Sequence, residues 1–377
     1  MKAVISRYVR SPFHFANKGG LTDIRPDDLA AQVVKGLLAR TDLDPALLED
    51  VILGCAYPEG PQGSNLARIV GLLAGLPEQV GGMTVNRFCG SSMSAIHIAA
   101  AQIEAGIGEA YLCVGVESMT MVPQGGLTPS PNPWLKEHSD AYISMGQTAE
   151  NVAQRYDISR RRQEQMALES HQKAATAREQ GHLREEIVAI QTGVNEWITE
   201  DGCIRPNSSL EALAKLPPAF GEHGVVTAGT ASPLTDGASA VLVTSDEFAQ
   251  RHNLSPLARI RAVATVGCDP AVMGLGPIPA TQKVLARGGV GADDLGVVEI
   301  NEAFASQALA CIGDLHLDPA TVNLDGGGMA IGHPLGATGA RITGKAAALL
   351  VREKARYALA TQCIGGGQGI ATLLEAL

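Results

Sequence analysis

The hydrophobic positions in the first third of the chain follow two alternating patterns. Residues 28–40 and 65–77 repeat apolar side chains at every third or fourth position, the spacing of a helix with one buried face. Residues 50–56, 81–88 and 109–119 are short segments rich in apolar and β-branched residues, which is typical of strands. This alternation predicts a mixed α/β sheet with helices on its faces.

The pattern changes in the middle of the chain. Residues 120–140 contain four of the 20 prolines and predict an irregular loop. Two charged helices are expected within 146–181, the second of them capped by Ser159, and a polar stretch follows. Strand and helix patterns resume at 238–246 and continue to the end of the chain. The middle segment therefore resembles an insertion into an α/β body.

Two segments of this body, one in each half of the chain, show the same order of predicted elements. Residues 83–99 and 320–350 each read as a strand, a Gly/Ser-rich turn and a helix. A duplication of one half of the body, with the turn facing inward in each copy, explains this repeated order. The expected boundaries are a first half at 1–117 to which 224–254 returns, an inserted loop domain at 118–223, and a second half at 255–377.

Composition narrows the class of partner. Hydrophobic residues make up 45% of the chain and charged residues 18%, which is enough apolar material for a large core. The net charge of −10 argues against nucleic acid as a partner. We find no apolar run of about 20 residues that predicts a membrane span, and neither a signal peptide nor a peroxisomal tripeptide. We therefore expect a cytoplasmic protein.

The seven cysteines argue against a metal site and a disulfide framework. They form no C-x-x-C pair, so we expect no bound metal, and their number is odd. Cys55 and Cys113 continue apolar strand patterns, which favours a packing role. Cys89 and Cys363 do not, because each one lies beside glycines at a predicted turn.

Cys89 is expected at the start of a helix. Apolar residues at Met93, Ile96, Ala100 and Ile103 follow it at helical spacing. Unpaired backbone N–H groups and the positive end of the helix dipole lower the pKa of a thiol in that position. The residues support either a nucleophilic thiol or a cysteine packed at a strand end.

The last third adds three further candidates. Asn301 follows the apolar strand LGVVEI, His333 lies in a glycine-rich turn, and Cys363 ends the strand YALATQ. Ligands of α/β proteins bind at such strand ends. A hydrogen-bonded core histidine and ordinary turn glycines are the structural alternatives. A dinucleotide site is disfavoured, because no G-x-G-x-x-G opens a helix here.

At these residues the chain resembles the thiolase family. The similarity runs nearly from end to end and includes five ordered motifs, NRFCGSSMSA, MGQTAENVA, INEAFA, GGMAIGHPLGATGAR and CIGGGQG. Three further stretches, around 205–220, 226–243 and 266–280, are most similar to the bacterial 3-ketoacyl-CoA thiolases of fatty-acid β-oxidation. The resemblance implies a five-layered αβαβα thiolase fold built from two similar halves, in which the inserted loop domain binds CoA.

The resemblance also implies catalytic roles. Cys89 is the expected acylated nucleophile, activated by His333. His333 and a water held by Asn301 form one expected oxyanion hole, and the N–H groups of Cys89 and Gly365 form a second. Cys363 is the expected general acid and base. The reaction implied is thiolytic cleavage of a 3-ketoacyl-CoA to acetyl-CoA and a shortened acyl-CoA.

Binding residues and partners follow from the same resemblance. CoA is expected as a co-substrate, with no permanently bound cofactor. Arg205 is expected near the CoA adenine and phosphates, Ser232 and Met145 near the pantetheine arm, and Ala303 and Phe304 beside them. A homodimer or homotetramer is expected, and some relatives join a multifunctional partner chain of β-oxidation.

Several alternatives stay open at this point. A short-chain acetoacetyl-CoA thiolase runs the same reaction as condensation, and a thiolase-like protein binds acyl-CoA without catalysis. A ketosynthase is disfavoured, because it uses a cysteine and two histidines. His14, Phe15 and Ser144 depart from common family patterns and leave the acyl-chain length open. The basic run at 160–162 faces either the CoA 3′-phosphate or solvent.

Overall fold

The computed structural model describes residues 1–377. Its long strands form a 10-stranded sheet along the path β4-β3-β5-β8-β1-β9-β12-β11-β10, with β2 paired to β8, while β6 and β7 form a separate hairpin. The strands are β1 (Ala3–Arg10), β2 (His14–Phe15), β3 (Asp50–Gly54), β4 (Gly81–Val85), β5 (Ala110–Ser118), β6 (Ile190–Gly193), β7 (Glu196–Ile198), β8 (Thr235–Ser245), β9 (Ala258–Gly267), β10 (Leu295–Ile300), β11 (Tyr357–Ile364) and β12 (Gln368–Glu375).

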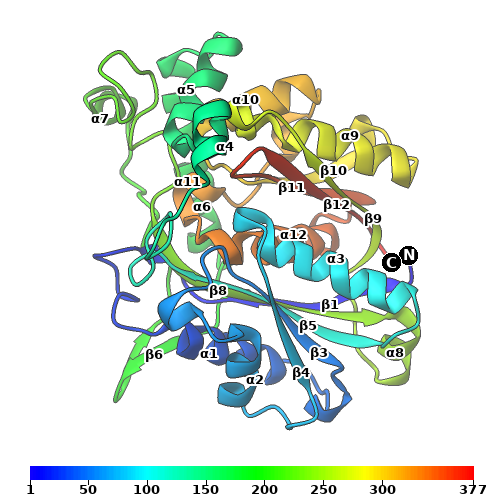
Figure 1. Ribbon diagram of the computed structural model, residues 1–377. Helices are drawn as coiled ribbons and strands as arrows, with labels where there is room; N and C mark the ends of the chain where they lie inside the picture. The colour runs from blue at the N-terminus through cyan, green and yellow to red at the C-terminus, as the bar shows by residue number, and fades with distance from the viewer.

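The helices divide the molecule into five layers (Figure 1). Helices α1 and α2 cover the outer face of one part of the sheet, α3 and α12 lie between the two parts, and α9 and α10 cover the outer face of the other part. The helices are α1 (Pro26–Leu38), α2 (Leu66–Ala74), α3 (Ser91–Glu104), α4 (Pro133–His138), α5 (Met145–Arg155), α6 (Arg160–Glu179), α7 (Leu210–Ala214), α8 (Asp246–Arg251), α9 (Pro277–Gly288), α10 (Ala305–Asp314), α11 (Gly328–Ile331) and α12 (Leu335–Glu353).

The two parts of the sheet repeat one topology. In the first part, β3 and β5 are parallel, and β5, β8 and β1 follow in antiparallel order. In the second part, β10 and β11 are parallel, and β11, β12 and β9 follow in antiparallel order. The two parts meet where β1 pairs with β9 at two positions, Val4 with Arg259 and Ile5 with Ala258. The two similar halves that the repeated order of elements predicts are therefore confirmed.

Close packing of the two central helices accounts for a glycine in α12. Helix α12 is buried along nearly its whole length because it packs between both parts of the sheet. A Cβ on Gly339 of α12 would lie 2.4 Å from the backbone nitrogen of Met93 in α3, so a side chain there is excluded. Glycine thus brings the two helices into close contact. Their N-terminal ends, preceded by Cys89 and His333, open toward the same side of the molecule (Figure 1).

The middle segment folds as helices α4 to α7 and the β6–β7 hairpin. Ser159 caps α6, as the sequence predicts, because its side chain accepts a hydrogen bond from the Arg162 N–H. The polar stretch before 223 also contains β6, β7 and α7, which the sequence pattern missed because these elements are short. None of the helices combines the length and apolar character needed to cross a membrane.

Candidate active site

Cys89 lies in a tight turn that leads directly into α3. The turn is a 3-10 helix over Phe88–Gly90, and α3 begins at Ser91. The Ser91 hydroxyl donates to the Phe88 carbonyl at 2.6 Å and accepts from the Arg87 N–H at 2.9 Å. Phe88 has a φ of 45°, a conformation that costs a non-glycine residue on the order of 1–3 kcal/mol. The backbone next to Cys89 is therefore held in one strained shape.

The surroundings of the Cys89 thiol combine opposing effects. Dense packing dominates and raises the pKa of Cys89 to about 11, although the side chain stays partly exposed. The N–H groups of Gly365 and of Cys89 itself lower that pKa, because both stabilise a thiolate, while the Glu117 carboxylate raises it. In the free protein the thiol is therefore protonated at neutral pH, and a base is needed to activate it.

His333 is a buried imidazole whose tautomer is set by its neighbours. The Thr338 hydroxyl donates to the Pro334 carbonyl at 3.1 Å, so it accepts from the Nδ1–H of His333 at 2.6 Å. The other ring nitrogen, Nε2, then carries a lone pair and accepts from the Asn301 amide at 3.3 Å. Burial, together with the nearby Arg341 charge, lowers the pKa of His333 to about 3. His333 is therefore a neutral imidazole whose Nε2 lone pair faces the Asn301 amide across a long contact.

Asn301 lies immediately after β10, where the sequence predicts it. Its backbone N–H donates to the Thr361 carbonyl of β11 at 3.0 Å, and its side-chain oxygen is buried without a partner. A Cβ on Gly328 would approach that oxygen to 2.8 Å, which explains a glycine at this position. The unpaired oxygen is available to a water molecule or a substrate group.

Cys363 is buried at the end of β11 and lies within electrostatic reach of Cys89. Burial raises the pKa of Cys363 well above its usual value, and a charge on Cys89 raises it further. The neighbouring Gln362 side chain donates to the backbone carbonyl of Cys89, which joins β11 to the Cys89 turn. Gly366 and Gly367 follow with φ values of 78° and 86°, which permit the sharp reversal into β12.

Four of the five expected CoA-binding residues gather next to Cys363. Met145, Ala303 and Phe304 share one apolar cluster with Cys363. The N–H of Ser232 donates to the Ala303 carbonyl at 2.9 Å, which places Ser232 beside this cluster. Met145 begins α5 in the middle segment, Ser232 lies just before β8, and Ala303 and Phe304 lie just before α10. The sequence resemblance identified these residues as a group.

Arg205 does not belong to that cluster. Its side chain is exposed, and its guanidinium carbon lies 5.2 Å from the centre of the Phe15 ring. The Lys18 ammonium nitrogen lies 4.6 Å from the centre of the same ring. Two cations next to one aromatic ring form a positively charged surface in a chain that is acidic as a whole.

The residues that depart from family patterns have structural roles. Ser144 caps α5 by accepting a hydrogen bond from the Gln147 N–H. His14 accepts from the Gly20 N–H at 3.1 Å, and its other nitrogen donates to the Glu200 carbonyl at 3.0 Å. In the basic run, Arg160 pairs with Glu164 and donates to three backbone carbonyls near α7. Arg160 is therefore occupied within the fold.

Sequence reasoning missed three residues that support the site. Thr338 fixes the His333 tautomer, Gln362 holds the Cys89 carbonyl, and Gly328 leaves room for Asn301. Thr338 and Gly328 flank His333 in the glycine-rich turn, so the length of that motif was the available signal. No group of three or more His, Cys, Asp or Glu side chains is arranged to hold a metal ion.

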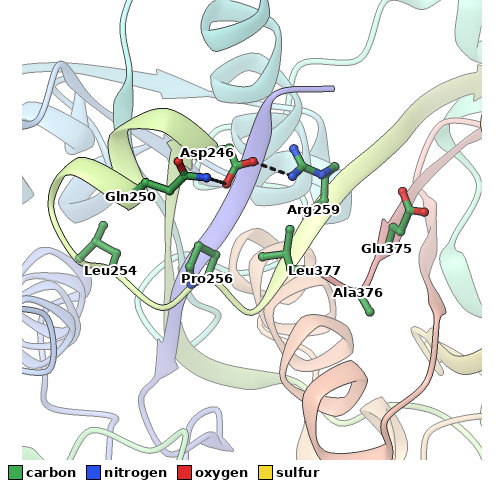
Figure 2. A pocket seen from close by; sticks show the side chains of 8 residues that line it. All are labelled: Asp246, Gln250, Leu254, Pro256, Arg259, Glu375, Ala376 and Leu377. Carbon is green, nitrogen blue, oxygen red and sulfur yellow. Dashed lines mark hydrogen bonds and ion pairs between the residues drawn. The ribbon is translucent and has the colours of Figure 1, made fainter.

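One surface hollow is separate from this site. Figure 2 shows it beside the chain ends, where Asp246 binds Arg259 at 2.7 Å, and its volume is about 570 Å³. Glu375 at its rim ends β12, whereas the start of β12 pairs with Cys363. The hollow and the cysteines thus lie at opposite ends of the same strand.

The fold is an α/β body of two similar halves that brings two cysteines, Cys89 and Cys363, within electrostatic reach of each other. The model of the thiolase N-terminal domain matches residues 3–247, and that of the thiolase C-terminal domain matches residues 254–376. The chain belongs to the thiolase family, which confirms the resemblance and the enzyme class inferred from the sequence.

Several relatives match this chain over nearly their whole lengths. A 3-ketoacyl-CoA thiolase of Saccharophagus degradans is 48% identical over 383 residues, which cover 99% of this chain and 97% of the relative. A protein of the same name from a Shewanella species is 46% identical, with 99% of each chain covered. Human mitochondrial 3-ketoacyl-CoA thiolase superposes with a TM-score of 0.92 at 37% identity, covering 99% of this chain and 98% of the human one. A second structure of the human enzyme, in complex with CoA, has the same score. The thiolase fold is therefore confirmed.

Proposed function

We propose that this enzyme cleaves 3-ketoacyl-CoA with CoA, through an acyl group carried on Cys89. The observation that carries the proposal is the electrostatic contact between Cys89 and Cys363, which come from different halves of the fold. The Asn301–His333 pair supports it, because Leu335, two residues after His333, shares an apolar cluster with Cys89, and the Asn301 N–H donates to Thr361 in the strand that carries Cys363. The names of relatives that match along the whole chain support the substrate class.

In the first step, Nε2 of His333 takes the proton of the Cys89 thiol. Its lone pair lies on Nε2 because Thr338 holds the proton on Nδ1, and the 3.3 Å contact from the Asn301 amide gives way when the proton is transferred. The Cys89 sulfur then forms a bond to C3 of the substrate, and the C2–C3 bond breaks. Each set of oxyanion donors contributes about 10²–10³ in rate. We assign one set to the N–H groups of Cys89 and Gly365, and the other to His333 with a water on Asn301.

The departing acetyl-CoA carbanion takes its proton from the Cys363 thiol. The resulting Cys363 thiolate then removes the proton of an incoming CoA thiol, whose sulfur attacks the acyl group on Cys89 and releases the shortened acyl-CoA. The Cys89 thiolate that leaves takes its proton back from His333, so both cysteines and the imidazole return to their starting protonation states. A buried thiol with a raised pKa suits the first role, because it stays protonated until the carbanion forms.

CoA binding is assigned to the surface between the middle segment and Cys363. Met145, Ser232, Ala303 and Phe304 would contact the pantetheine arm, and Arg205 would attract the phosphates. The middle segment at 118–223 would act as the loop domain for this ligand. The structure of the human relative in complex with CoA supports CoA as the ligand.

Assembly and location belong to the same proposal. We infer a cytoplasmic homodimer or homotetramer, with a multifunctional partner chain of β-oxidation as a further partner. Strand β4 supports self-association, because it ends the sheet with one edge unpaired. Leu72 and Leu73 of α2, next to β4, are 47% and 41% exposed. Size-exclusion chromatography with light scattering tests the oligomeric state.

The experiment that tests the substrate class is a series of kcat/KM values for thiolysis of 3-ketoacyl-CoAs from C4 to C16. Activity that extends beyond C4 supports the degradative function. A sharp optimum at C4, without activity on longer chains, would instead assign the short-chain acetoacetyl-CoA enzyme acting in condensation. Absence of any thiolysis, with CoA still bound, would assign a non-catalytic acyl-CoA-binding protein.

A further inference from the structure

Glu117 is a fully buried carboxylate near the end of β5, and both of its oxygens accept hydrogen bonds. One oxygen accepts from the N–H groups of Ala56 at 2.8 Å and Gly336 at 2.9 Å. The other accepts from the N–H of Tyr57 at 3.2 Å and the side-chain amide of Gln62 at 2.9 Å. Four N–H donors from three separate segments therefore converge on one side chain.

One of these segments is the start of α12. The residue before α12, Pro334, provides no side-chain cap, and Gly336 is the second residue of the helix. Glu117 supplies the missing acceptor from 219 residues away and places a negative charge at the positive end of the helix dipole. A Cβ on Gly336 would lie 2.5 Å from the Val116 carbonyl, so the contact is close. His333 lies three residues before Gly336.

The second segment, residues 55–57, contacts Cys89. Ala56, Tyr57 and Leu335 lie in the same small apolar cluster as Cys89. The Tyr57 ring centre lies 5.8 Å from that of Phe88, the residue before Cys89. Glu117 therefore binds the backbone beneath Cys89 and the backbone beyond His333 at the same time.

We propose that Glu117 is a positioning residue whose carboxylate holds the Cys89 turn and the start of α12 together, so that Cys89 and His333 face one substrate. The proposal rests on the function proposed above for Cys89 and His333. Glu117 does not touch the expected CoA-binding residues, so it acts on the chemical step and leaves substrate binding unchanged.

The hydrogen-bond pattern requires a carboxylate. Gln62 is itself oriented, because its side-chain oxygen accepts from the Ser118 N–H at 2.6 Å and its nitrogen donates to the Tyr57 carbonyl at 2.7 Å. A glutamine at position 117 would turn its own NH2 group toward two N–H donors in either orientation. Glu117→Gln thus preserves the shape of the side chain and removes both the charge and two acceptor contacts.

The test compares Glu117→Gln with a matched control, Glu186→Gln. Glu186 is also a buried glutamate, and it contacts α12 through Lys345 at 3.0 Å. In the control, Lys345 keeps Asp325 at 2.6 Å and Arg10 keeps Asp201 at 2.6 Å. Thiolysis kinetics, thermal unfolding, and the rate of Cys89 alkylation by iodoacetamide across pH are measured for both variants.

For Glu117→Gln we expect kcat to fall about 10²-fold with KM within twofold, the cost of a misplacement of about 1 Å. The pH midpoint of Cys89 alkylation should fall, because a negative charge near the thiol is lost. The other titratable neighbours of Cys89, namely Tyr57, Cys363 and the His333 assigned above as its base, are unchanged. Glu186→Gln should keep the wild-type kcat and alkylation profile even where its unfolding temperature falls.

A Glu117→Gln variant with wild-type kcat and an unchanged alkylation profile would overturn the proposal, as would equal kinetic losses in both variants. If Glu117→Gln does not fold, Glu117→Asp replaces it. The shorter side chain keeps the charge and withdraws the carboxylate, so kcat should fall while the alkylation midpoint stays in place; unchanged kcat there contradicts the proposal. Alkylation needs no thiolase activity, so these results stay separate from a failure of the proposed function.

Discussion

The side-chain amide of Asn301 donates to Nε2 of His333 at 3.3 Å, and both residues are buried. On the other side of the ring, Thr338 accepts the Nδ1 proton at 2.6 Å. Two neutral partners thus fix the ring and leave no carboxylate to stabilise an imidazolium. His333 gains a proton only when a thiolate or an oxyanion lies next to it, which couples activation of Cys89 to the arrival of substrate.

The low pKa of His333 predicts a pH-dependent stability difference. Its pKa is about 3 in the folded protein and about 6.5 in the unfolded chain, so below pH 6.5 the unfolded state binds the extra proton. The wild type should therefore lose stability relative to His333→Gln by up to about 1.4 kcal/mol per pH unit as the pH falls from 6.5 toward 3. Urea unfolding at pH 7, 6, 5 and 4 measures this. A difference that stays constant with pH would show that the folded protein tolerates a charged His333.

Replacement of Cys89 by alanine should abolish acyl-enzyme formation and leave CoA binding in place. Mass spectrometry of the wild type, after incubation with substrate, should show one acyl adduct on Cys89, and thiolysis by the variant should fall about 10⁴-fold or more. Cys113, which is buried in β5, provides the control, since Cys113→Ala should keep the adduct. An adduct that persists in Cys89→Ala is incompatible with the assigned nucleophile.

Replacement of Cys363 by alanine should separate the two half-reactions. Cys89 should still accept an acyl group from a reactive acyl-CoA, because that step releases a thiolate and forms no carbanion. Cleavage of the C2–C3 bond should fall about 10²–10⁴-fold, the usual range for a positioned acid or base. Single-turnover acylation and steady-state thiolysis measure the two steps. Near-wild-type thiolysis would make Cys363 a packing residue in a glycine-rich turn.

Gly328→Ala should impair catalysis through Asn301. The new Cβ would lie 2.8 Å from the Asn301 side-chain oxygen, so the amide must move away from His333. We expect kcat to fall by about 10²-fold, measured by steady-state thiolysis. Gly313→Ala is the matched control: Gly313 lies in α10 with nothing within 4 Å of the added methyl, so it should keep full activity and gain about 0.5–1 kcal/mol of stability. Equal activities of the two variants would contradict the prediction.

Local features of the site were predictable, whereas the contacts between its parts were not. Helical spacing after Cys89 places that residue at a helix start, and the side chain of Ser159 caps α6 as its type suggests. In contrast, the hydrogen bond from Gln362 to the Cys89 carbonyl joins residues 273 positions apart. The spacing of hydrophobic residues along the chain does not indicate such a long-range pair. The family resemblance supplied the grouping that the residues alone left open.

Glu117 shows why the supporting residues were missed. In the sequence it is one polar residue at the end of an apolar strand, and its four donors belong to segments that the hydrophobic pattern treats separately. Three of the donors are backbone N–H groups, which every non-proline residue possesses. A hydrogen bond to a backbone N–H group requires no particular side chain at the donor residue. The sequence therefore gives no sign of it, and only the folded structure shows it.

Because the two halves share a central layer of helices, the chain does not divide into two independent folding units. Helices α3 and α12 come from different halves and bury one another between the two parts of the sheet. A chain cut in the loop after α8, near 253, would yield two fragments that each expose half of a common core and carry part of the reactive set. Neither fragment is self-sufficient, so activity should return only when both are refolded together. Although the architecture repeats, each copy depends on the other for a complete core and for a complete set of reactive residues.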